Sequence, residues 1–506
     1  MPTYTITIKN GDEVTEVQAE AGQRALHVIQ DAGIPFLAPC GGNGKCGKCL
    51  VYVHEGEGSG LRLACQTEIS DNMILELGGP QTMIIEGDAV ASSYQADGGK
   101  SGLGVALDIG TTTLACRMFD LGTGKLLASA ARINPQAVWG ADVISRISAS
   151  VDKKLPQMTE AVLHAVDLMV EELLNKTGHQ REEMTDFTLA GNTVMEHIAA
   201  GLPPDSIGFN PFTPLSLFGD YRELKYIPCP AWFAPCVASY VGGDISAGLI
   251  ACDVHKSENP EVLIDLGTNG ELSLGSRHGI VSCATAAGPV FEGANIFFGM
   301  PALPGAISEV WEEGDRLAYN TIGDAEPKGI CGTGLIDAVA YMLRKGLVDE
   351  TGYLLEASEC PEHAAWLGQE NSGSVFYLTA DHRIYITQRD IRNIQLGKSA
   401  VYSGLMVLLD EAGLDLQGVT KLFIAGGFGK KLNLESAATV GIIPRAWLDR
   451  AVAVGNSSVE GASAALLSAE ARQDMLALWD ITKYIELSIT ASFNDYFVEN
   501  MMFPEA

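Results

Sequence analysis

VALDIGTTTLACRM (residues 105–118) is the most informative segment for the architecture of this chain, because VLIDLGTNGELSLG (262–275) repeats it. Each copy is an apolar run that ends in Asp-x-Gly-Thr and continues into a second apolar run. This pattern is typical of a buried strand, a tight turn and a returning strand. FTLAGNTV (187–194) and LFIAGGFG (422–429) repeat in the same order further along the chain. The repetition predicts two related lobes, each built around its own sheet.

Helical patterns lie between these predicted strands. The clearest one is formed by apolar residues at helical spacing, namely Val162, Val166, Met169, Val170 and Leu173. Strands that alternate with helices indicate α/β lobes whose sheets are covered by helices. We place the first lobe at residues 103–255. The second lobe, at 256–506, has larger insertions and a C-terminal extension from Tyr484 that we expect to pack on it.

The first 77 residues form a smaller domain. Residues 3–8 alternate between apolar and other side chains and lead to an Asn-Gly turn at Asn10, which predicts a β-hairpin. The remaining elements predicted here are a helix at 22–32 and strands at 50–53 and 73–77. Together they describe a small α+β domain. Residues 78–102 lack a clear period, and we interpret them as a linker that contains one short strand at 83–85.

Four cysteines lie within this small domain, at Cys40, Cys46, Cys49 and Cys65. Four thiolates can hold a 2Fe–2S cluster. The segment between the first three is rich in glycine, and glycines let backbone N–H groups approach a negatively charged cluster. A structural zinc site and free thiols are the alternatives. Zinc sites usually pair two Cys-x2-Cys units, and only one is present, so the pattern favours the iron–sulfur cluster.

The two Asp-x-Gly-Thr turns are candidate phosphate sites. The first contains Asp108, Gly110, Thr111 and Thr112, and the second contains Asp265, Gly267, Thr268 and Asn269. Backbone N–H groups and hydroxyls of such turns suit phosphate oxygens, and an aspartate at a strand end can hold Mg²⁺ through water. Two such turns that face each other would clamp a triphosphate between them.

Further residues are candidates around the nucleotide. Gly426 and Gly427 would let the backbone approach a flat ligand such as adenine, although a plain strand-to-helix turn is the alternative. Asp244, Glu271 and Glu292 could position the water that attacks the terminal phosphate, with solvated surface carboxylates as the alternative.

Composition excludes some classes of protein. The net charge of −30, from 63 acidic and 33 basic residues, repels phosphate backbones, so broad nucleic-acid binding is not expected. The sequence contains no run of eighteen apolar residues, so no transmembrane helix is expected. The N-terminal segment does not resemble a signal peptide. We therefore expect a cytoplasmic protein. Its other seven cysteines are then expected to be buried thiols and not disulfides.

At these residues the chain resembles a known superfamily. The two turns and the AGGFG segment are similar to those of the sugar kinase, heat-shock 70 and actin ATPases. With the four-cysteine domain added, the chain resembles the reductive activators of corrinoid proteins. Other segments that match are INPQAVWGADVISRI (133–147), LAGNTVMEHIAAG (189–201), VGGDISAG (241–248), GPVFEGANIFFGM (288–300), ICGTGLIDA (330–338) and ITQRDIRNIQLGKSA (386–400). The resemblance implies an α+β ferredoxin-like (β-grasp) N-terminal domain and duplicated ribonuclease H-like lobes.

The resemblance also implies an activity. Members of this family use ATP to drive one electron from a 2Fe–2S centre to the Co(II) of a corrinoid protein, giving Co(I) for methyl transfer. It implies that the four cysteines bind the cluster. It further implies that Mg²⁺ and phosphates are held by Asp108, Gly110, Thr111, Asp265, Gly267, Thr268 and Asn269.

The implied partners are a corrinoid protein and a low-potential electron donor. A homodimer stays open, because some members carry an extra domain that contributes dimer contacts, whereas here about 25 residues separate Leu77 from Leu103. Two other functions also stay open, a nucleotide-sensing electron-transfer adaptor and a small-molecule kinase with an attached cluster.

Overall fold

The computed structural model describes residues 2–10, 13–34, 36, 42, 44, 49–54, 60–77, 92–267, 269–314, 316–370, 373–426 and 431–504. The described residues form two compact units. One contains the chain up to Leu77 and from Gly98 to Phe233. The other contains Ser92–Asp97 and the chain from Ala234 onward. The predicted strand at 83–85 lies outside the described residues.

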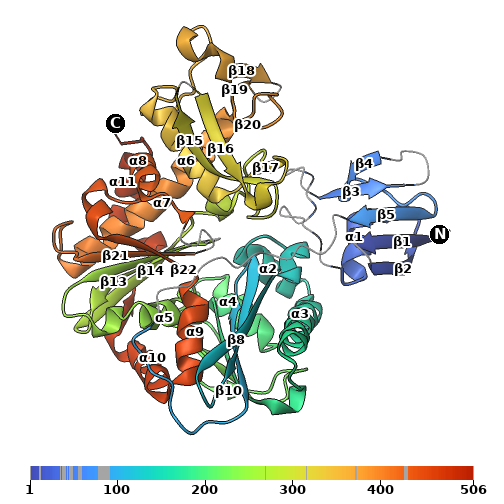
Figure 1. Ribbon diagram of the computed structural model, residues 1–506, viewed down its shortest axis with the longest axis vertical. Coiled ribbons are helices and arrows are strands. Elements are labelled where there is room, and N and C mark those ends of the chain that lie inside the picture. Colours follow the sequence, from blue (N-terminus) through green and yellow to red (C-terminus); the bar gives the residue numbers. More distant parts are fainter. Residues whose placement is uncertain are drawn as a thin grey trace. The chain divides into compact units, whose positions relative to one another are not determined.

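The N-terminal residues form a five-stranded mixed sheet and one helix (Figure 1). The strands, in sheet order, are β2 (Glu13–Glu20), β1 (Thr3–Asn10), β5 (Met73–Leu77), β3 (Leu50–Val53) and β4 (Gly60–Leu63). Helix α1 (Ala25–Asp31) packs Leu26 and Ile29 into one core with Ile6 and Ile8 of the sheet. The predicted hairpin, helix and strands are therefore confirmed, and β4 is an addition to them.

The first lobe is built on a six-stranded sheet. Its strands, in sheet order, are β10 (Tyr221–Arg222), β11 (Ala231–Phe233), β9 (Met184–Gly191), β6 (Leu103–Ile109), β7 (Thr113–Asp120) and β8 (Lys125–Ile133). The helices of this lobe are α2 (Val143–Val151), α3 (Leu155–Thr177) and α4 (Thr193–Ala199). All five apolar residues that predicted a helix at 162–173 are buried in α3, which confirms it.

The second lobe repeats this sheet. Its strands, in sheet order, are β22 (Ala451–Gly455), β21 (Lys421–Gly426), β12 (Glu261–Leu266), β13 (Gly270–Ser276), β14 (Gly279–Thr285) and β23 (Thr482–Tyr484). The register repeats too: Asp108 lies opposite Ala190 on β9, and Asp265 lies opposite Ala425 on β21. The predicted duplication is therefore confirmed at the level of individual residues.

Helices and two small sheets complete the second unit. Its helices are α5 (Gly243–Ala251), α6 (Gly332–Arg344), α7 (Gln388–Ala412), α8 (Leu434–Val440), α9 (Ser457–Leu467), α10 (Ala469–Ile481) and α11 (Ala491–Glu499). One small sheet holds β15 (Ala306–Glu313), β16 (Arg316–Thr321) and β17 (Gly329–Ile330), and the other holds β18 (Leu367–Glu370), β19 (Gly373–Tyr377) and β20 (Tyr385–Thr387). Both small sheets lie within the insertions expected for the second lobe.

The C-terminal extension packs on the second lobe, as expected. β23 adds to the sheet beside β14, and α11 lies along α7 (Figure 1). The Ser399 hydroxyl of α7 donates to the Phe497 carbonyl oxygen at 2.6 Å. The buried Phe503 donates its backbone N–H to the Glu350 carbonyl at 2.8 Å. The extension is thus part of the hydrophobic core of the lobe.

The boundary between the two units differs from the predicted boundary between the lobes. The units divide between Phe233 and Ala234, so α5, which carries Asp244, belongs with Asp265 and Glu271. Within the predicted linker, residues Ser92–Asp97 also belong to the second unit. No helix in the described part of the chain is both long and apolar enough to cross a membrane.

Tyr94 is one of the residues that attach the segment Ser92–Asp97 to the second unit, together with Ser93 and Asp97. The Tyr94 hydroxyl donates to Asp474 Oδ2 of α10 at 2.5 Å and lies 2.8 Å from His255 Nε2. Lys256 Nζ stands 3.6 Å from the centre of the Tyr94 ring, a cation–π geometry. Burial and the neighbouring Asp474 carboxylate raise the pKa of Tyr94, so its hydroxyl stays protonated and keeps donating.

Substitution Tyr94→Phe is therefore expected to destabilise the second unit. It removes the hydroxyl that binds Asp474 and His255, which costs about 1–2 kcal/mol of unfolding free energy. Chemical denaturation of both proteins measures the change, and Tyr52→Phe, at an exposed tyrosine of the first unit, is the control. Identical denaturation midpoints for wild type and Tyr94→Phe would contradict the prediction.

Candidate functional site

Two of the four predicted cluster ligands lie side by side in the structure. Cys49 precedes β3 and Cys65 follows β4, and these strands pair antiparallel with Leu50 opposite Leu63. The Cys65 backbone N–H donates to Cys49 Sγ at 3.5 Å, and both thiols are buried. A backbone N–H that donates to a sulfur stabilises the negative charge of a metal-bound thiolate. Cys40 and Cys46, the other two, lie outside the described residues.

The glycines beside these thiols fit a cluster loop. Gly42 has a φ of +85°, and a Cβ there would come within 2.8 Å of Leu26 Cδ2 and 3.8 Å of Cys65 Cβ. Gly44 has a φ of +71°, and a Cβ there would meet the Gln66 amide at 2.9 Å. Gly42 and Gly44 can therefore lie this close to Leu26, Cys65 and Gln66 because they carry no side chain. The residues present fit an iron–sulfur cluster.

The seven other cysteines are buried free thiols, as expected. Burial raises the pKa of Cys116 and Cys252 to about 12 and that of Cys229 to about 11. Such thiols stay protonated at neutral pH and act as small apolar side chains.

The first Asp-x-Gly-Thr turn, which we call the first phosphate turn after its predicted role, connects β6 to β7 and is braced by hydrogen bonds to its carbonyl oxygens. Asn134 Nδ2 donates to the Gly110 oxygen at 2.8 Å, and the Asn134 N–H donates to the Thr112 oxygen at 2.8 Å. The Arg146 guanidinium donates to the Thr111 oxygen. Asn192 Nδ2 donates to Thr111 Oγ1 at 2.9 Å. The turn is therefore held in one conformation, with Asp108 buried at the preceding strand end.

The second phosphate turn connects β12 to β13. The Gly267 N–H donates to the Asn269 oxygen at 3.1 Å, which closes the turn, and Thr268 lies outside the described residues. Asp265 Oδ1 lies 3.7 Å from the position that a Cβ of Gly267 would take. It lies 3.1 Å from the same position at Gly426. The Asp265 carboxylate thus sits between the turn and the end of β21.

Three predicted carboxylates meet at this turn. Glu271 lies on β13 directly opposite Asp265, and Asp244 lies in the first turn of α5. Burial raises the pKa of Glu271 well above its usual range, and the charges of Asp244 and Asp265 raise it further. Glu292 is the last residue of the short helix η5 (Pro289–Glu292). A cation would offset the repulsion among the three carboxylates and any bound phosphates.

Gly426 allows β21 to approach this turn, whereas Gly427 lies outside the described residues. Gly426 has a φ of +118°, and a Cβ there would lie 2.5 Å from the Leu266 carbonyl oxygen. Any side chain at this position therefore displaces either β21 or the residues that lead into the second phosphate turn.

Substitution Gly426→Ala is expected to weaken ATP binding. A backbone strain of about 1–3 kcal/mol in the turn corresponds to roughly ten- to a hundredfold in affinity. Titration with ATP measures it. Gly413→Ala is the matched control, because Gly413 also has a positive φ, of +64°, but a Cβ there meets nothing within 4 Å. Equal ATP affinities for the two variants would contradict the prediction.

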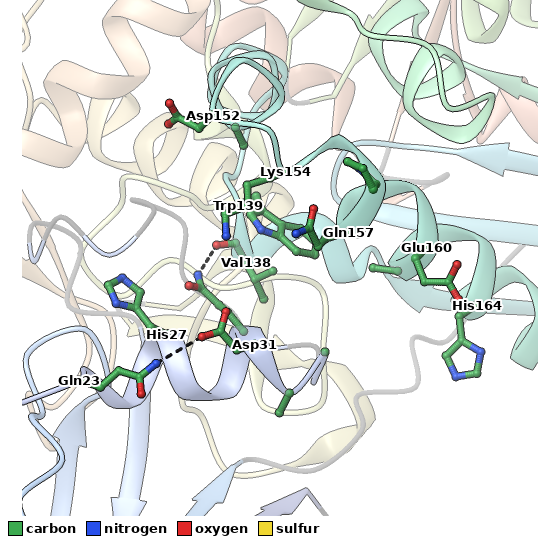
Figure 2. A pocket seen from close by; sticks show the side chains of 16 residues that line it. Gln23, His27, Asp31, Val138, Trp139, Asp152, Lys154, Gln157, Glu160 and His164 are labelled. Carbon is green, nitrogen blue, oxygen red and sulfur yellow. Dashed lines mark hydrogen bonds between the residues drawn. The ribbon is translucent and has the colours of Figure 1, made fainter. Parts of the chain in front are cut away.

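The first unit contains a pocket of about 1190 Å³ (Figure 2). Its lining comes from α1 and its neighbours and from residues 138–164. Figure 2 shows that the Gln23 side chain donates a hydrogen bond to Asp31 of α1. Gln30, also on α1, donates to the Val138 carbonyl oxygen. Its lining includes none of the predicted site residues. It therefore adds nothing to the nucleotide site.

The residues that hydrogen-bond to the first turn were not predicted from the sequence. Asn134, Arg146 and Asn192 lie in matching segments, but their neighbours in sequence do not reveal what they contact. The signal that could have found Arg146 is its position, because it shares a helical face with Val143 and Ile147, where a charged side chain is unusual.

Comparison with known proteins agrees with this architecture. Three family models match the chain in order: a 2Fe–2S iron–sulfur cluster binding domain (residues 8–70), the RACo middle region (103–257) and the C-terminal domain of RACo, the ASKHA domain (259–506). The corrinoid activation enzyme RamQ of Eubacterium limosum is 27% identical, covering 96% of this chain and 98% of RamQ. A Methanosarcina barkeri reductase of the Co(II) methylated amine-specific corrinoid protein is 24% identical, covering 78% of this chain and 76% of the reductase.

A solved structure extends the comparison to three dimensions. The reductive activator for corrinoid, iron–sulfur protein has a TM-score of 0.72 and 28% identity, and the match covers 99% of this chain and 98% of that one. Its fold thus agrees with both the ferredoxin-like domain and the duplicated lobes over nearly the whole length. The chain belongs to the family of RACo-type reductive activators, which join an iron–sulfur domain to an ATP-binding ASKHA domain.

Proposed function

We propose that this protein reductively activates a corrinoid protein, using ATP to drive one electron from its 2Fe–2S cluster to Co(II) and so form Co(I). The observation that carries the proposal is the presence, on one chain, of the Cys49–Cys65 thiol pair and two equivalent Asp-x-Gly turns. Both named relatives act on corrinoid proteins, RamQ as an activation enzyme and the Methanosarcina protein as a reductase.

The proposed roles follow from the geometry. When bound by Cys40, Cys46, Cys49 and Cys65, the cluster supplies one-electron chemistry. Burial keeps water away from the Cys49 sulfur, and the N–H of Cys65 stabilises the thiolate charge. The first turn, with Asp108, Gly110, Thr111 and Thr112, binds phosphate oxygens. The second turn, with Gly267, Thr268 and Asn269, does the same, and Gly426 and Gly427 leave room for the rest of the nucleotide.

The carboxylates complete the nucleotide site. We propose that Asp265 and Asp108 hold Mg²⁺ and that Asp244 and Glu271 shape the site of the attacking water. ATP is needed because reduction of the corrinoid runs uphill. Each ~59 mV of uphill transfer costs about 1.4 kcal/mol per electron, and coupling between binding sites supplies ~1–3 kcal/mol. A low-potential donor then returns the protein to its reduced state.

To test the proposal, the anaerobically reduced protein is mixed with a Co(II) corrinoid protein, and the absorbance band of Co(I) is measured over time. The band is expected to grow with ATP and to stay small without it, or with an analogue that cannot be hydrolysed. Free phosphate is measured in parallel, because phosphate found on an acceptor would indicate a kinase instead. Equal Co(I) yields with and without ATP would contradict the proposal, whereas equal yields with ATP and with the analogue, without phosphate release, would favour a nucleotide-sensing adaptor.

A further inference from the structure

The first phosphate turn lies against a buried polar network. Its members, all nine-tenths or more buried, are Asn134, Gln136, Arg146 and Asn192. Asn134 directly follows β8, and Arg146 lies on α2. Asn192 caps the N-terminus of α4, where its side-chain oxygen accepts from the Met195 N–H at 3.0 Å. Residues from three separate elements therefore converge on one four-residue turn. Burying this many polar groups is costly unless each is bound, so the network is a built feature of the fold.

Arg146 is the centre of the network. Its side chain is fully buried, and Nη2 donates to the Thr111 carbonyl oxygen. Nη1 donates to Gln136 Oε1 at 3.2 Å and contacts Met195 Sδ at 2.9 Å, while Nε donates to the Gly140 oxygen at 3.3 Å. The planar guanidinium fork can satisfy these directions together, which an ammonium cannot. Arg146 thus ties the phosphate turn to α4 and to the segment before α2.

The bound carbonyls determine where the turn's N–H groups point. In a trans peptide, the carbonyl oxygen of one residue and the N–H of the next lie on opposite sides. Asn134 holds the Gly110 oxygen and Arg146 holds the Thr111 oxygen. The N–H groups of Thr111 and Thr112 are therefore directed away from the network. These are the donors that a phosphate-binding turn presents to an anion.

We propose that Arg146 is a positioning residue for ATP: through the Thr111 carbonyl it orients the N–H groups of the first turn toward the phosphates, without touching the nucleotide. Asn134 performs the same task at the neighbouring peptide. The inference rests on the proposed function, because it needs ATP at this turn. Arg146 and Asn134 belong to the segment 133–147, which matches the family but contains none of the residues predicted to bind ATP.

The variants Arg146→Gln, Arg146→Lys and Asn134→Ser test the proposal, with ATP affinity, the KM for ATP and kcat as readouts. Arg146→Gln is expected to raise the KM for ATP at least about tenfold, with a smaller fall in kcat, because uniformly lost binding appears in KM. Arg146→Lys keeps the charge but not the fork, and should recover only part of the affinity. The visible spectrum of the cluster and the thermal midpoint report whether each variant is folded.

Arg132→Gln is the matched control, because Arg132 is a partly exposed arginine of the same lobe that pairs with Glu172 at 3.0 Å. If Arg146→Gln does not fold, Asn134→Ser decides, since it removes the bond to Gly110 while the arginine stays. A folded Arg146→Gln, or a folded Asn134→Ser in its place, with a KM for ATP within twofold of wild type would overturn the inference. A wild-type protein that binds no ATP would instead overturn the proposed function.

Discussion

Substitution of Cys49 or Cys65 by alanine is expected to abolish both the visible absorbance of the cluster and the formation of Co(I) on the corrinoid partner. Alanine offers no ligand, and the two thiols are held together by the β3–β4 pairing, so no neighbouring side chain replaces them. ATP affinity should stay within about twofold of wild type, because neither cysteine belongs to the predicted nucleotide turns and sites without shared partners contribute independently. Iron and sulfide counts, an absorbance spectrum and an ATP titration on each variant measure these three effects.

Cys252→Ala is the control for this experiment. Cys252 is also a buried thiol, with a pKa raised to about 12 by burial, but it lies at the end of α5 in the second unit. It should retain full iron and sulfide content. A variant at Cys49 that keeps wild-type iron content and Co(I) formation would show that the cluster is bound elsewhere.

Substitution Asp265→Asn is expected to lower ATP-driven Co(I) formation by roughly a hundredfold or more, the scale at which charges aimed at a reacting centre matter. The change is nearly isosteric, so the turn and the contact with Gly426 keep their shape, while the negative charge that would hold Mg²⁺ is lost. The pKa of Glu271 should also fall toward its usual range, since the Asp265 charge is one of the causes that raise it. Phosphate release and Co(I) absorbance are measured with the cluster spectrum as a check of integrity.

The matching control is Asp449→Asn, at a carboxylate whose side chain is 78% exposed. It should hydrolyse ATP and form Co(I) at wild-type rates. If Asp265→Asn also does so, the second turn is not where ATP is cleaved, and the duplicated turns would serve structure alone.

The outlines of the fold could be predicted from the sequence because they depend on local patterns. Alternation at residues 3–8, the helical spacing in α3 and the repeated Asp-x-Gly strands all reflect neighbours within a few residues. The short strand β4 was missed because Gly60–Leu63 is brief and acquires its pairing only from β3. The position of Tyr94 was missed for a similar reason, since its partners Asp474 and His255 lie far along the chain.

The chemistry expected of this protein could be inferred from local sequence, because the spacing of the four cysteines and the two Asp-x-Gly turns can be recognised without the fold. The side chains that contact these predicted site residues could be identified only from the tertiary structure. Glu271 faces Asp265 because of the β12–β13 register, and Arg146 reaches Thr111 because α2 packs beneath the first turn. Local conformational preferences act over a few residues, whereas burial and hydrogen bonding between distant segments depend on how the whole lobe packs.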